Sequence, residues 1–374
     1  MKLTPGKAIL LALILLGATV TGVRFARGLG AVTHLSDRFP WGLWVGFDVL
    51  VGVALAAGGF TMAAAVYVFN LKRFEPLLRP AILTAFLGYI LVILALLVDL
   101  GRPYRIWHPM IMWNPRSVMF EVAWCVMLYT TVLALEFSPA VFERLRMERP
   151  RKIIRAVTVP LVIAGVILST LHQSSLGALF LIVPEKLHPL WYTPLLPILF
   201  FVSALAVAPA MVILEALVSA RAYRRQPEGE LLGELASVIP VILGIYLLLK
   251  LYALGTGGSI TWVFAGTVES MMYWLELLLG VVLPAFLLAI PDVRRSVRGL
   301  LWSSSLVVLG VVLNRLNVAI IGMWAAAGTR YLPSWMEVAI TAGIVALGIF
   351  LYTVAVEHLP IFPEQRLRLV QQER

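Results

Sequence analysis

WGLWVGFDVLVGVALAAGGFTMAAAVYVF, residues 41–69, contains a single charged residue, Asp48. A helix needs about 20 apolar residues to cross the roughly 30 Å hydrocarbon core of a bilayer, so this run is long enough to span a membrane. Comparable runs recur along all 374 residues, and the chain is 61% hydrophobic and only 13% charged. Soluble domains carry about twice that share of charged residues. We therefore predict an all-α integral membrane protein.

The apolar runs predict ten transmembrane helices. They lie at residues 8–23, 41–69, 80–98, 117–138, 156–178, 194–220, 234–254, 269–290, 300–327 and 335–356. Spans two to five and six to nine are expected to form two four-helix bundles, with the first and last helices at the periphery. The chain then divides into an N-terminal helix and outer loop at 1–40, a first bundle at 41–183, a second bundle at 184–334, and a last helix with a tail at 335–374.

The basic residues fall almost entirely on alternate sides of these spans. The two chain ends and the loops after even-numbered spans carry 20 Lys and Arg, whereas the remaining loops carry 8. Cytoplasmic loops of membrane proteins carry the excess of positive charge, so we expect both termini in the cytoplasm. The net charge of +10 is thus a sign of topology. No basic surface interleaved with aromatic residues is present to predict nucleic-acid binding.

A sequence repeat relates the two predicted bundles. Residues 165–177 read GVILSTLHQSSLG and residues 310–322 read GVVLNRLNVAIIG, an offset of 145 at both glycine pairs. An offset of four spans makes the copies parallel in the membrane. His172 in the first copy then corresponds to Asn317 in the second. Chance similarity between apolar, glycine-containing helices is the alternative.

Four ionisable side chains lie at similar depths in the first predicted bundle: Asp48, Asp99, Glu121 and His172. Such groups are costly inside a membrane and are therefore candidates for function. A quinone needs hydrogen-bond donors for its carbonyls, an apolar slot for its ring and groups that exchange protons. We predict a quinone and proton site here, with Asp48, Glu121 and His172 as the catalytic residues.

Further side chains are predicted to bind the quinone. Trp41 and Trp44 share a helix face with Asp48 through three- and four-residue spacing, while Gln173 and Ser175 lie beside the histidine in span five. Structural roles stay open for the catalytic set. The aspartate can pair with an arginine such as Arg105, the glutamate can bond to span-five hydroxyls, and the histidine can be a satisfied core residue.

The outer loop that follows Asp99 carries arginines on the side with few basic residues. Arg102 and Arg105 alternate with Tyr104 and Trp107, and Arg, Tyr and Trp are enriched at protein interfaces. We predict a docking surface for an extracytoplasmic partner, and we include Asp99, Arg102 and Arg105 among the quinone-binding residues. An interfacial aromatic belt is the alternative for the loop, and an Asp99–Arg102 anchor is the alternative for the aspartate.

A second polar set lies in the later spans. Lys250 or Arg315 pairing with Glu276 would neutralise buried charges, whereas a proton path leading inward is the functional alternative. The remaining candidates for that path are Glu215, Glu269, Asn314 and Asn317.

Redox cofactors are not expected in this chain. Iron–sulfur clusters are typically held by four thiolates, and the sequence has one cysteine, Cys125. A membrane b-type haem is usually held by two imidazoles from facing helices, and His172 is the only histidine well inside a predicted span. We therefore predict no haem, no iron–sulfur cluster and no metal ligands.

Several motifs resemble the NrfD family of membrane subunits. They are FPWGLWVGFD at 39–48, ALAAGG at 54–59, RPAILT at 79–84, DLGR at 99–102, SVMFE at 117–121 and HQSSLG at 172–177. The likeness is closest to the HybB branch, the ten-helix quinone-reactive subunit of membrane-bound nickel–iron hydrogenases. Residues 190–374 match the family only in hydropathy and layout.

The resemblance implies a cofactor-free subunit of the bacterial inner membrane. It would exchange electrons between menaquinone or ubiquinone and a periplasmic ferredoxin-like iron–sulfur subunit of a hydrogenase, with coupled proton transfer. The alternatives are a quinol-oxidising anchor of a molybdenum or multihaem reductase, a secondary transporter and a purely structural anchor. The branch carries a "b-type cytochrome" label, which the histidine count here does not support.

Overall fold

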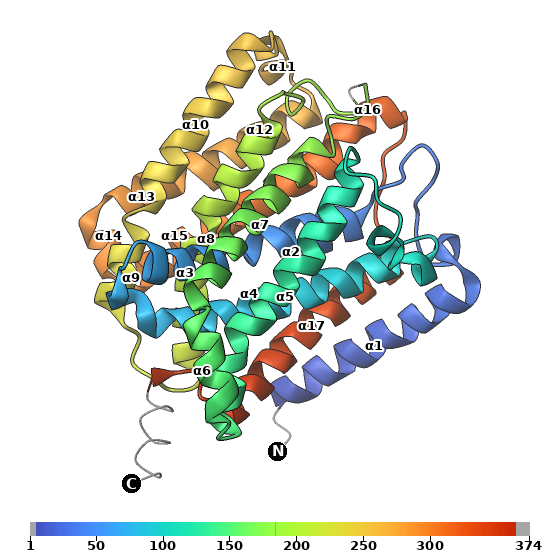
Figure 1. Ribbon diagram of the computed structural model, residues 1–374. Helices are drawn as coiled ribbons and strands as arrows, with labels where there is room; N and C mark the ends of the chain where they lie inside the picture. The colour runs from blue at the N-terminus through green and yellow to red at the C-terminus, as the bar shows by residue number, and fades with distance from the viewer. Residues whose placement is uncertain (1–4, 184, 364–374) are drawn as a thin grey trace.

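The computed structural model describes residues 5–183 and 185–363, and all named elements in these two ranges are helical (Figure 1). Ten of the described helices are long and apolar enough to cross a membrane, which confirms the predicted fold class. They are Pro5–Arg27, Trp44–Val68, Lys72–Asp99, Val118–Arg144, Thr158–Ala178, Leu196–Ala222, Gly229–Thr256, Val268–Ala289, Val297–Ala327 and Trp335–His358.

Most spans contain one main α-helix, and several are built from two or more segments. The main helices are α1 (Pro5–Arg27), α4 (Glu75–Asp99), α5 (Val118–Arg144), α7 (Thr158–Ala178), α8 (Leu196–Ala222), α10 (Ile239–Thr256), α12 (Val268–Leu277), α13 (Leu283–Ala289), α15 (Val297–Ala319) and α17 (Trp335–His358). Shorter α-helices are α2 (Gly52–Leu55), α3 (Gly58–Ala63), α6 (Glu148–Ala156), α9 (Gly229–Ala236), α11 (Ile260–Val263), α14 (Pro291–Arg295) and α16 (Trp324–Ala327). The 3₁₀ segments are η1 (Leu29–Ala31), η4 (Lys72–Phe74), η5 (Pro103–Arg105), η6 (His108–Met110) and η8 (Ile321–Met323).

The second span departs from a regular α-helix. It begins with the π-helical segment η2 (Trp44–Val51) and ends with another, η3 (Ala64–Val68). A third π-helical segment, η7 (Leu278–Val282), lies in span eight. Such segments are rare and occur frequently at functional sites because they redirect side chains. Two buried carboxylates are placed this way: Asp48 lies within η2, and Glu276 lies two residues before η7.

Helices contact one another both within and between the two predicted groups of spans. α4 packs against η2, α3 and α5, and α5 packs against α7; α8 packs against α10 and α15, and α15 packs against η7 and α12. α7 with α8 and η2 with α15 join the two groups. Division of the chain at residues 40, 183 and 334 stays a prediction.

The first and last helices lie at the edge of the molecule. Only 17% of the most apolar part of α1 is buried in the protein, against 78% for the second span and 67% for α8 and α15. α1 runs along α17, which in turn contacts α4 and η2 (Figure 1). Gly17 and Gly343 let the two backbones approach, since a Cβ on either would lie 2.9 Å from the Cα of the other. α17 therefore lies between α1 and the first group of helices.

The two faces of the protein are named here by their loops. The basic face carries the beginning of α1, α6, α9, α14 and the end of α17, and the opposite face carries α11 and α16 (Figure 1). The loops of the basic face hold the excess of Lys and Arg that the sequence shows.

Spans eight and nine cross at a pair of glycines. A Cβ on Gly280 would lie 2.4 Å from the Cα of Gly310, and a Cβ on Gly310 would lie 2.3 Å from the Cα of Gly280. Small residues let membrane helices approach in this way. Glu276 and Asn314 each lie four residues from the crossing, one helical turn on each helix, so the crossing brings these two side chains together.

We expect Gly310→Leu to prevent correct assembly of spans eight and nine. No side chain fits between the two backbones, and overpacking a core costs about 1–3 kcal/mol even where some relaxation is possible. The measurement is size-exclusion chromatography of the detergent-solubilised subunit. Gly244→Leu is the matched control, because a Cβ at Gly244 meets nothing within 4 Å. A normal elution profile for Gly310→Leu would contradict the close crossing.

Candidate functional site

A large apolar cavity of about 500 Å³ lies between the first group of helices, α8 and α17. Its walls come from η2 and α2, from one face of α4, and from α8 and α17, with leucine, valine and glycine predominating. Ligand pockets typically measure about 300–1,000 Å³ and combine apolar walls with a few polar groups. This cavity is therefore large enough for a ring and part of an apolar chain.

One end of the cavity is marked by Asp48. Its side chain is 7% exposed and accepts a hydrogen bond of 2.6 Å from the Thr341 hydroxyl on α17. No ion pair of Asp48 occurs among the described residues, so the alternative of a pair with Arg105 is not what the structure shows. The threonine leaves the second carboxyl oxygen of Asp48 available to a ligand or a water.

The other end of the cavity has a second carboxyl and hydroxyl pair. Glu215 on α8 accepts a hydrogen bond of 2.6 Å from the Tyr352 hydroxyl on α17. Thr341 and Tyr352 are eleven residues apart, which is about 17 Å along a helix. The cavity thus extends along about three turns of α17, with one carboxyl near each end.

Residues just before and at the start of α17 bind the beginning of the π-helical segment η2. The Trp44 indole donates to the Glu337 carbonyl at 3.2 Å, and the Tyr331 hydroxyl accepts from the Leu43 amide at 2.9 Å and donates to the Glu337 carboxylate. Burial and this carboxylate raise the pKa of Tyr331, which lies outside the spans, so the phenol stays a donor. Trp44 thus makes a structural contact with α17. This contact lies on the side of the predicted site that is nearer to the face carrying α11 and α16.

His172 lies in a different place from Asp48. It is fully buried, and one ring nitrogen, Nδ1, lies 2.9 Å from the Tyr89 hydroxyl of α4. Gln173 donates to the Val53 carbonyl at 3.0 Å. α4 separates the two regions, because Thr84, Leu87, Gly88 and Leu91 face the cavity whereas Tyr89 faces the histidine.

The interior around His172 has unused polar atoms. The buried Nε2 of His172 has no hydrogen-bond partner among the described residues, and the same holds for the Gln173 side-chain oxygen. Buried polar groups are nearly always satisfied by protein or by ordered water. The two unpartnered atoms are therefore positions at which an ordered water can bind.

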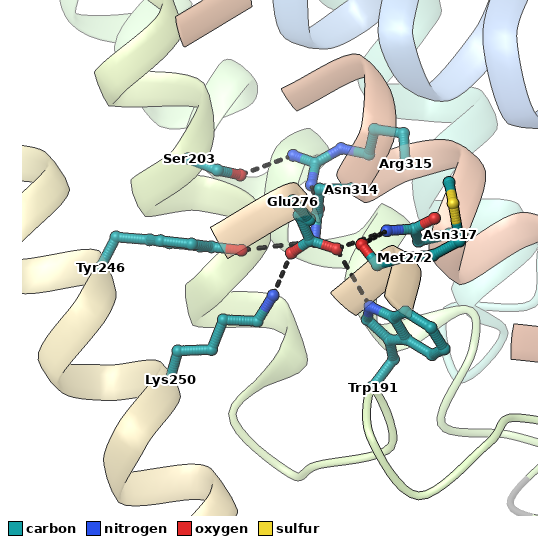
Figure 2. A network of polar contacts seen from close by, with 9 residues as sticks. All are labelled: Trp191, Ser203, Tyr246, Lys250, Met272, Glu276, Asn314, Arg315 and Asn317. Carbon is teal, nitrogen blue, oxygen red and sulfur yellow. Dashed lines mark hydrogen bonds and ion pairs between the residues drawn. The ribbon is translucent and has the colours of Figure 1, made fainter. Parts of the chain in front are cut away.

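A second polar network surrounds Glu276 (Figure 2). One carboxylate oxygen accepts from Lys250 and, at 2.9 Å, from Asn314; the other accepts from Asn317 at 2.8 Å and from the Trp191 indole at 3.1 Å. The glutamate is 1% exposed and the lysine 4%. Of the two pairings the sequence left open, the structure shows Lys250 with Glu276.

Arg315 is bound to the same network through a neighbour. Its guanidinium donates to the Asn314 side-chain oxygen at 2.6 Å and to the Ser203 hydroxyl at 2.8 Å (Figure 2). It also stacks over the Phe200 ring at 3.7 Å. Asn314 thus bridges Arg315 to Glu276. The network contains two cations and one anion, all nearly fully buried.

The remaining predicted site residues lie apart from the cavity. The Trp41 ring meets Phe180 edge-on at 5.4 Å, and the Ser175 hydroxyl donates to its own helix at Leu171 O, 2.7 Å away. Glu121 is half-buried in the first turn of α5. Of the ten predicted site residues, Asp48 alone lines the cavity.

The residues after α4 form an end to the helix and an exposed loop. Arg24 of α1 donates to the carbonyls of Val98 and Leu100 at 2.6 and 2.5 Å and so binds the end of α4 beside Asp99. Arg102 and Arg105 are exposed, and the Arg105 guanidinium lies 5.8 Å from the Tyr104 ring. An Asp99–Arg102 ion pair does not occur among the described contacts.

Sequence reasoning missed the contribution of α17. Thr341 and Tyr352 carry no signal of their own, because hydroxyl residues are common in transmembrane helices. Glu337 did have a signal: Ser334-Trp-Met-Glu337 is a capping box, with a serine followed three residues later by a glutamate, and the structure forms it.

The comparison with protein families decides the affiliation of the chain. Residues 31–327 match the family model described as "Polysulphide reductase, NrfD". The chain belongs to the NrfD family. The resemblance deduced from motifs at 39–177 is thereby confirmed, and the match extends well into the second group of helices.

Curated relatives cover nearly the whole chain. A protein of Nitratidesulfovibrio vulgaris without a descriptive name is 40% identical over 97% of this chain and 95% of its own length. The "Probable Ni/Fe-hydrogenase 2 b-type cytochrome subunit" of Escherichia coli is 37% identical over 91% and 88%. The "Menaquinone reductase, integral membrane subunit" of N. vulgaris is 28% identical over 91% and 87%. The likeness to the hydrogenase branch of the NrfD family is confirmed.

The residues present do not fit the b-type haem in the name of the E. coli relative. Such a haem is usually held by two imidazoles that face each other inside the membrane. His172 has its Nδ1 beside Tyr89 in a packed interior, whereas His34 and His188 lie in loops, His108 begins η6 and His358 ends α17. No group of three His, Cys, Asp or Glu suited to a metal occurs among the described residues.

Proposed function

We propose that this protein is the quinone-reactive membrane subunit of a respiratory oxidoreductase complex. The observation that carries the proposal is the apolar cavity of about 500 Å³ with Asp48 at one end. Its walls suit the ring and isoprenoid chain of menaquinone or ubiquinone, and its carboxyl suits the exchange of a proton with a quinone oxygen. The names of the NrfD-family relatives, which include a menaquinone reductase subunit, support the same substrate class.

The proposed position of the head group is the Asp48 end of the cavity. There the quinone carbonyl accepts a proton from the carboxyl group while Thr341 holds that group in position. Electrons arrive from the opposite face, which is nearer to Asp48 than to Glu215. The His172 and Tyr89 pair lies behind α4 and serves as a further proton store, not as a direct contact.

The proposed partner is a ferredoxin-like iron–sulfur subunit on the opposite face. The loop between α4 and α5 presents Tyr104, Trp107, Ile111 and Trp113, which are 49–67% exposed, beside Arg102 and Arg105. Aromatic residues and arginine are characteristic of binding hot spots. Because the relative in E. coli is named as a subunit of a nickel–iron hydrogenase, we propose a hydrogenase as the enzyme that supplies electrons to the iron–sulfur partner.

The proposed location is the bacterial inner membrane with the basic face in the cytoplasm. Positive charge marks the cytoplasmic side of membrane proteins, and since an even number of spans puts both ends on one side, we propose that both ends are cytoplasmic. The opposite face is then periplasmic, where the partner docks.

The experiment is a mild-detergent purification from native membranes, followed by identification of the co-purifying subunits and an assay of quinone turnover. We expect an iron–sulfur subunit, hydrogenase subunits, hydrogen-dependent quinone reduction and no Soret band from this chain. A molybdenum or multihaem partner would keep the quinone site and reverse the direction of electron flow. A chain that neither binds nor turns over quinone would overturn the proposal, and a stoichiometric b-type spectrum would overturn its haem-free chemistry.

A further inference from the structure

The segment between α5 and α7 carries a dense patch of positive charge on the basic face. Residues 143–155 contain six Arg and Lys and two Glu. Both glutamates are paired: Glu143 binds Arg79 at 2.6 Å, and Glu148 binds Arg151 at 2.8 Å. Five exposed cations of the segment, here called the α6 patch, make no ion pair among the described residues: Arg144, Arg146, Arg149, Lys152 and Arg155. The patch therefore has positive charge available to an anionic ligand.

Helix α6 presents two of these cations beside an apolar side chain. Arg149, Lys152 and Ile153 share one face through three- and four-residue spacing. Ile153 is 65% exposed, whereas Arg151 and Ile154 on the other side of the helix are half-buried. An exposed apolar side chain next to Lys and Arg is typical of the membrane interface, where cationic side chains reach the headgroups and apolar groups lie in the acyl region. The exposed face of α6 is therefore suited to the boundary between headgroups and acyl chains.

An exposed apolar stripe on α7 follows α6 along the chain. Val159, Ile163 and Ile167 recur every four residues and are 46–54% exposed, and Val157, at the junction of the two helices, is 40% exposed. The rest of the described chain leaves these side chains uncovered, so they face lipid in a membrane. The stripe from Val159 to Ile167 is about 12 Å long, and half of the hydrocarbon core is about 15 Å thick. The α7 stripe thus has the length of the acyl region of one leaflet.

We propose that the α6 patch and the α7 stripe together bind an anionic phospholipid of the leaflet at the basic face. Arg149 and Lys152 bind its phosphate, and its acyl chains lie against Ile153 and the stripe. Cations near a membrane surface attract anionic lipids, so the unpaired charge favours an anionic headgroup over a zwitterionic one. The apolar stripe favours a lipid over an acidic soluble protein, because a soluble protein does not reach the hydrocarbon core. The inference is independent of the proposed function and needs only the membrane location that the ten spans give.

The test uses the whole complex in phosphatidylcholine vesicles that contain a varied share of a photoreactive lipid. The lipid is phosphatidylglycerol or phosphatidylcholine, each with the same diazirine on one acyl chain, and peptide mapping after illumination locates the label. We expect saturable labelling of residues 157–171 by phosphatidylglycerol and weak, unsaturable labelling by phosphatidylcholine.

The decisive variant combines Arg149→Gln with Lys152→Gln. We expect the share of phosphatidylglycerol needed for half-maximal labelling to rise about 30-fold, as the loss of two cations near an anionic headgroup predicts. The matched control combines Arg295→Gln with Arg298→Gln, which removes two exposed cations from the same face and leaves α6 intact. This control is expected to label as wild type does, and Arg149→Lys, which keeps the charge, is expected to retain the labelling.

Three results would overturn the lipid site. They are equal labelling of α7 by the two lipids, unchanged half-maximal labelling in the double variant, and an acidic soluble protein that is lost from the double variant while phosphatidylglycerol shows no preference. If the double variant fails to assemble, Lys152→Gln decides: a shift of about fivefold supports the site, and no shift refutes it. Quinone turnover is not a readout here, so failure of the lipid site leaves the proposed function standing.

Discussion

Glu276→Gln is expected to destroy the stability of the subunit, whereas Lys250→Met is expected to weaken it only moderately. The reason is the charge balance of the buried network. Removing the glutamate charge leaves Lys250 and Arg315 as two buried cations without an anion. Breaking a buried ion pair by removing one partner costs about 3–5 kcal/mol, because the other charge stays desolvated. Here two cations are left, so the loss is expected at the upper end of that range.

The Lys250→Met variant leaves a different balance of buried charges. Without Lys250, the Glu276 carboxylate still accepts from Asn314, Asn317 and Trp191, and Arg315 remains linked to it through Asn314. One cation and one anion remain. Methionine fills much of the space of the lysine stem, so the expected cost is about 1–3 kcal/mol, the cost of leaving one polar group less well satisfied.

The measurement is thermal unfolding of the detergent-solubilised subunit, followed by size-exclusion chromatography. Glu269→Gln, in the first turn of α12, serves as the control on the same helix and is expected to change little. If Lys250→Met proves as harmful as Glu276→Gln, the charge balance of the network is not what determines its stability.

The fold could be predicted from the sequence because the membrane imposes it. Every backbone polar group must be satisfied within the span, so each long apolar run becomes a helix. The boundaries differ where proline is tolerated. The third span begins at Lys72, well before the predicted residue 80, because Pro76 lies in the first turn of α4 and Pro80 is accommodated inside it. The π-helical form of η2 was not predicted, since no local sequence rule identifies such segments.

The site could be predicted only in part, for a physical reason. Asp48 was identified because it is a lone charge in a 29-residue apolar run, and a charge inside a membrane is costly. Its partner, Thr341, is 293 residues away on the last helix, and contacts between distant helices leave no periodic trace in one sequence. His172 was predicted to lie at a similar depth, but depth does not tell which side of α4 a side chain faces.

Asp48→Asn is expected to lower quinone turnover by about 100-fold, the loss typical for removal of a general acid or base. Asparagine has nearly the same shape as aspartate and can still bond to Thr341, so the cavity and the assembly of the complex are retained. What is lost is the exchangeable proton. Turnover is measured on the purified complex with a soluble quinone analogue, and assembly is checked by the subunit ratio.

Thr341→Val separates the chemistry of Asp48 from its position. The valine variant loses the 2.6 Å hydrogen bond but leaves the carboxyl in place, so we expect a fall in turnover of less than about tenfold, in keeping with a bond worth about 1 kcal/mol. Asp37→Asn, an exposed aspartate in the loop before η2, is the matched control. Equal losses in Asp48→Asn and Thr341→Val would mean that the hydrogen bond, and not the proton, is what the cavity needs from Asp48. Wild-type turnover in Asp48→Asn would remove this residue from the mechanism. No other predicted catalytic residue lines the cavity.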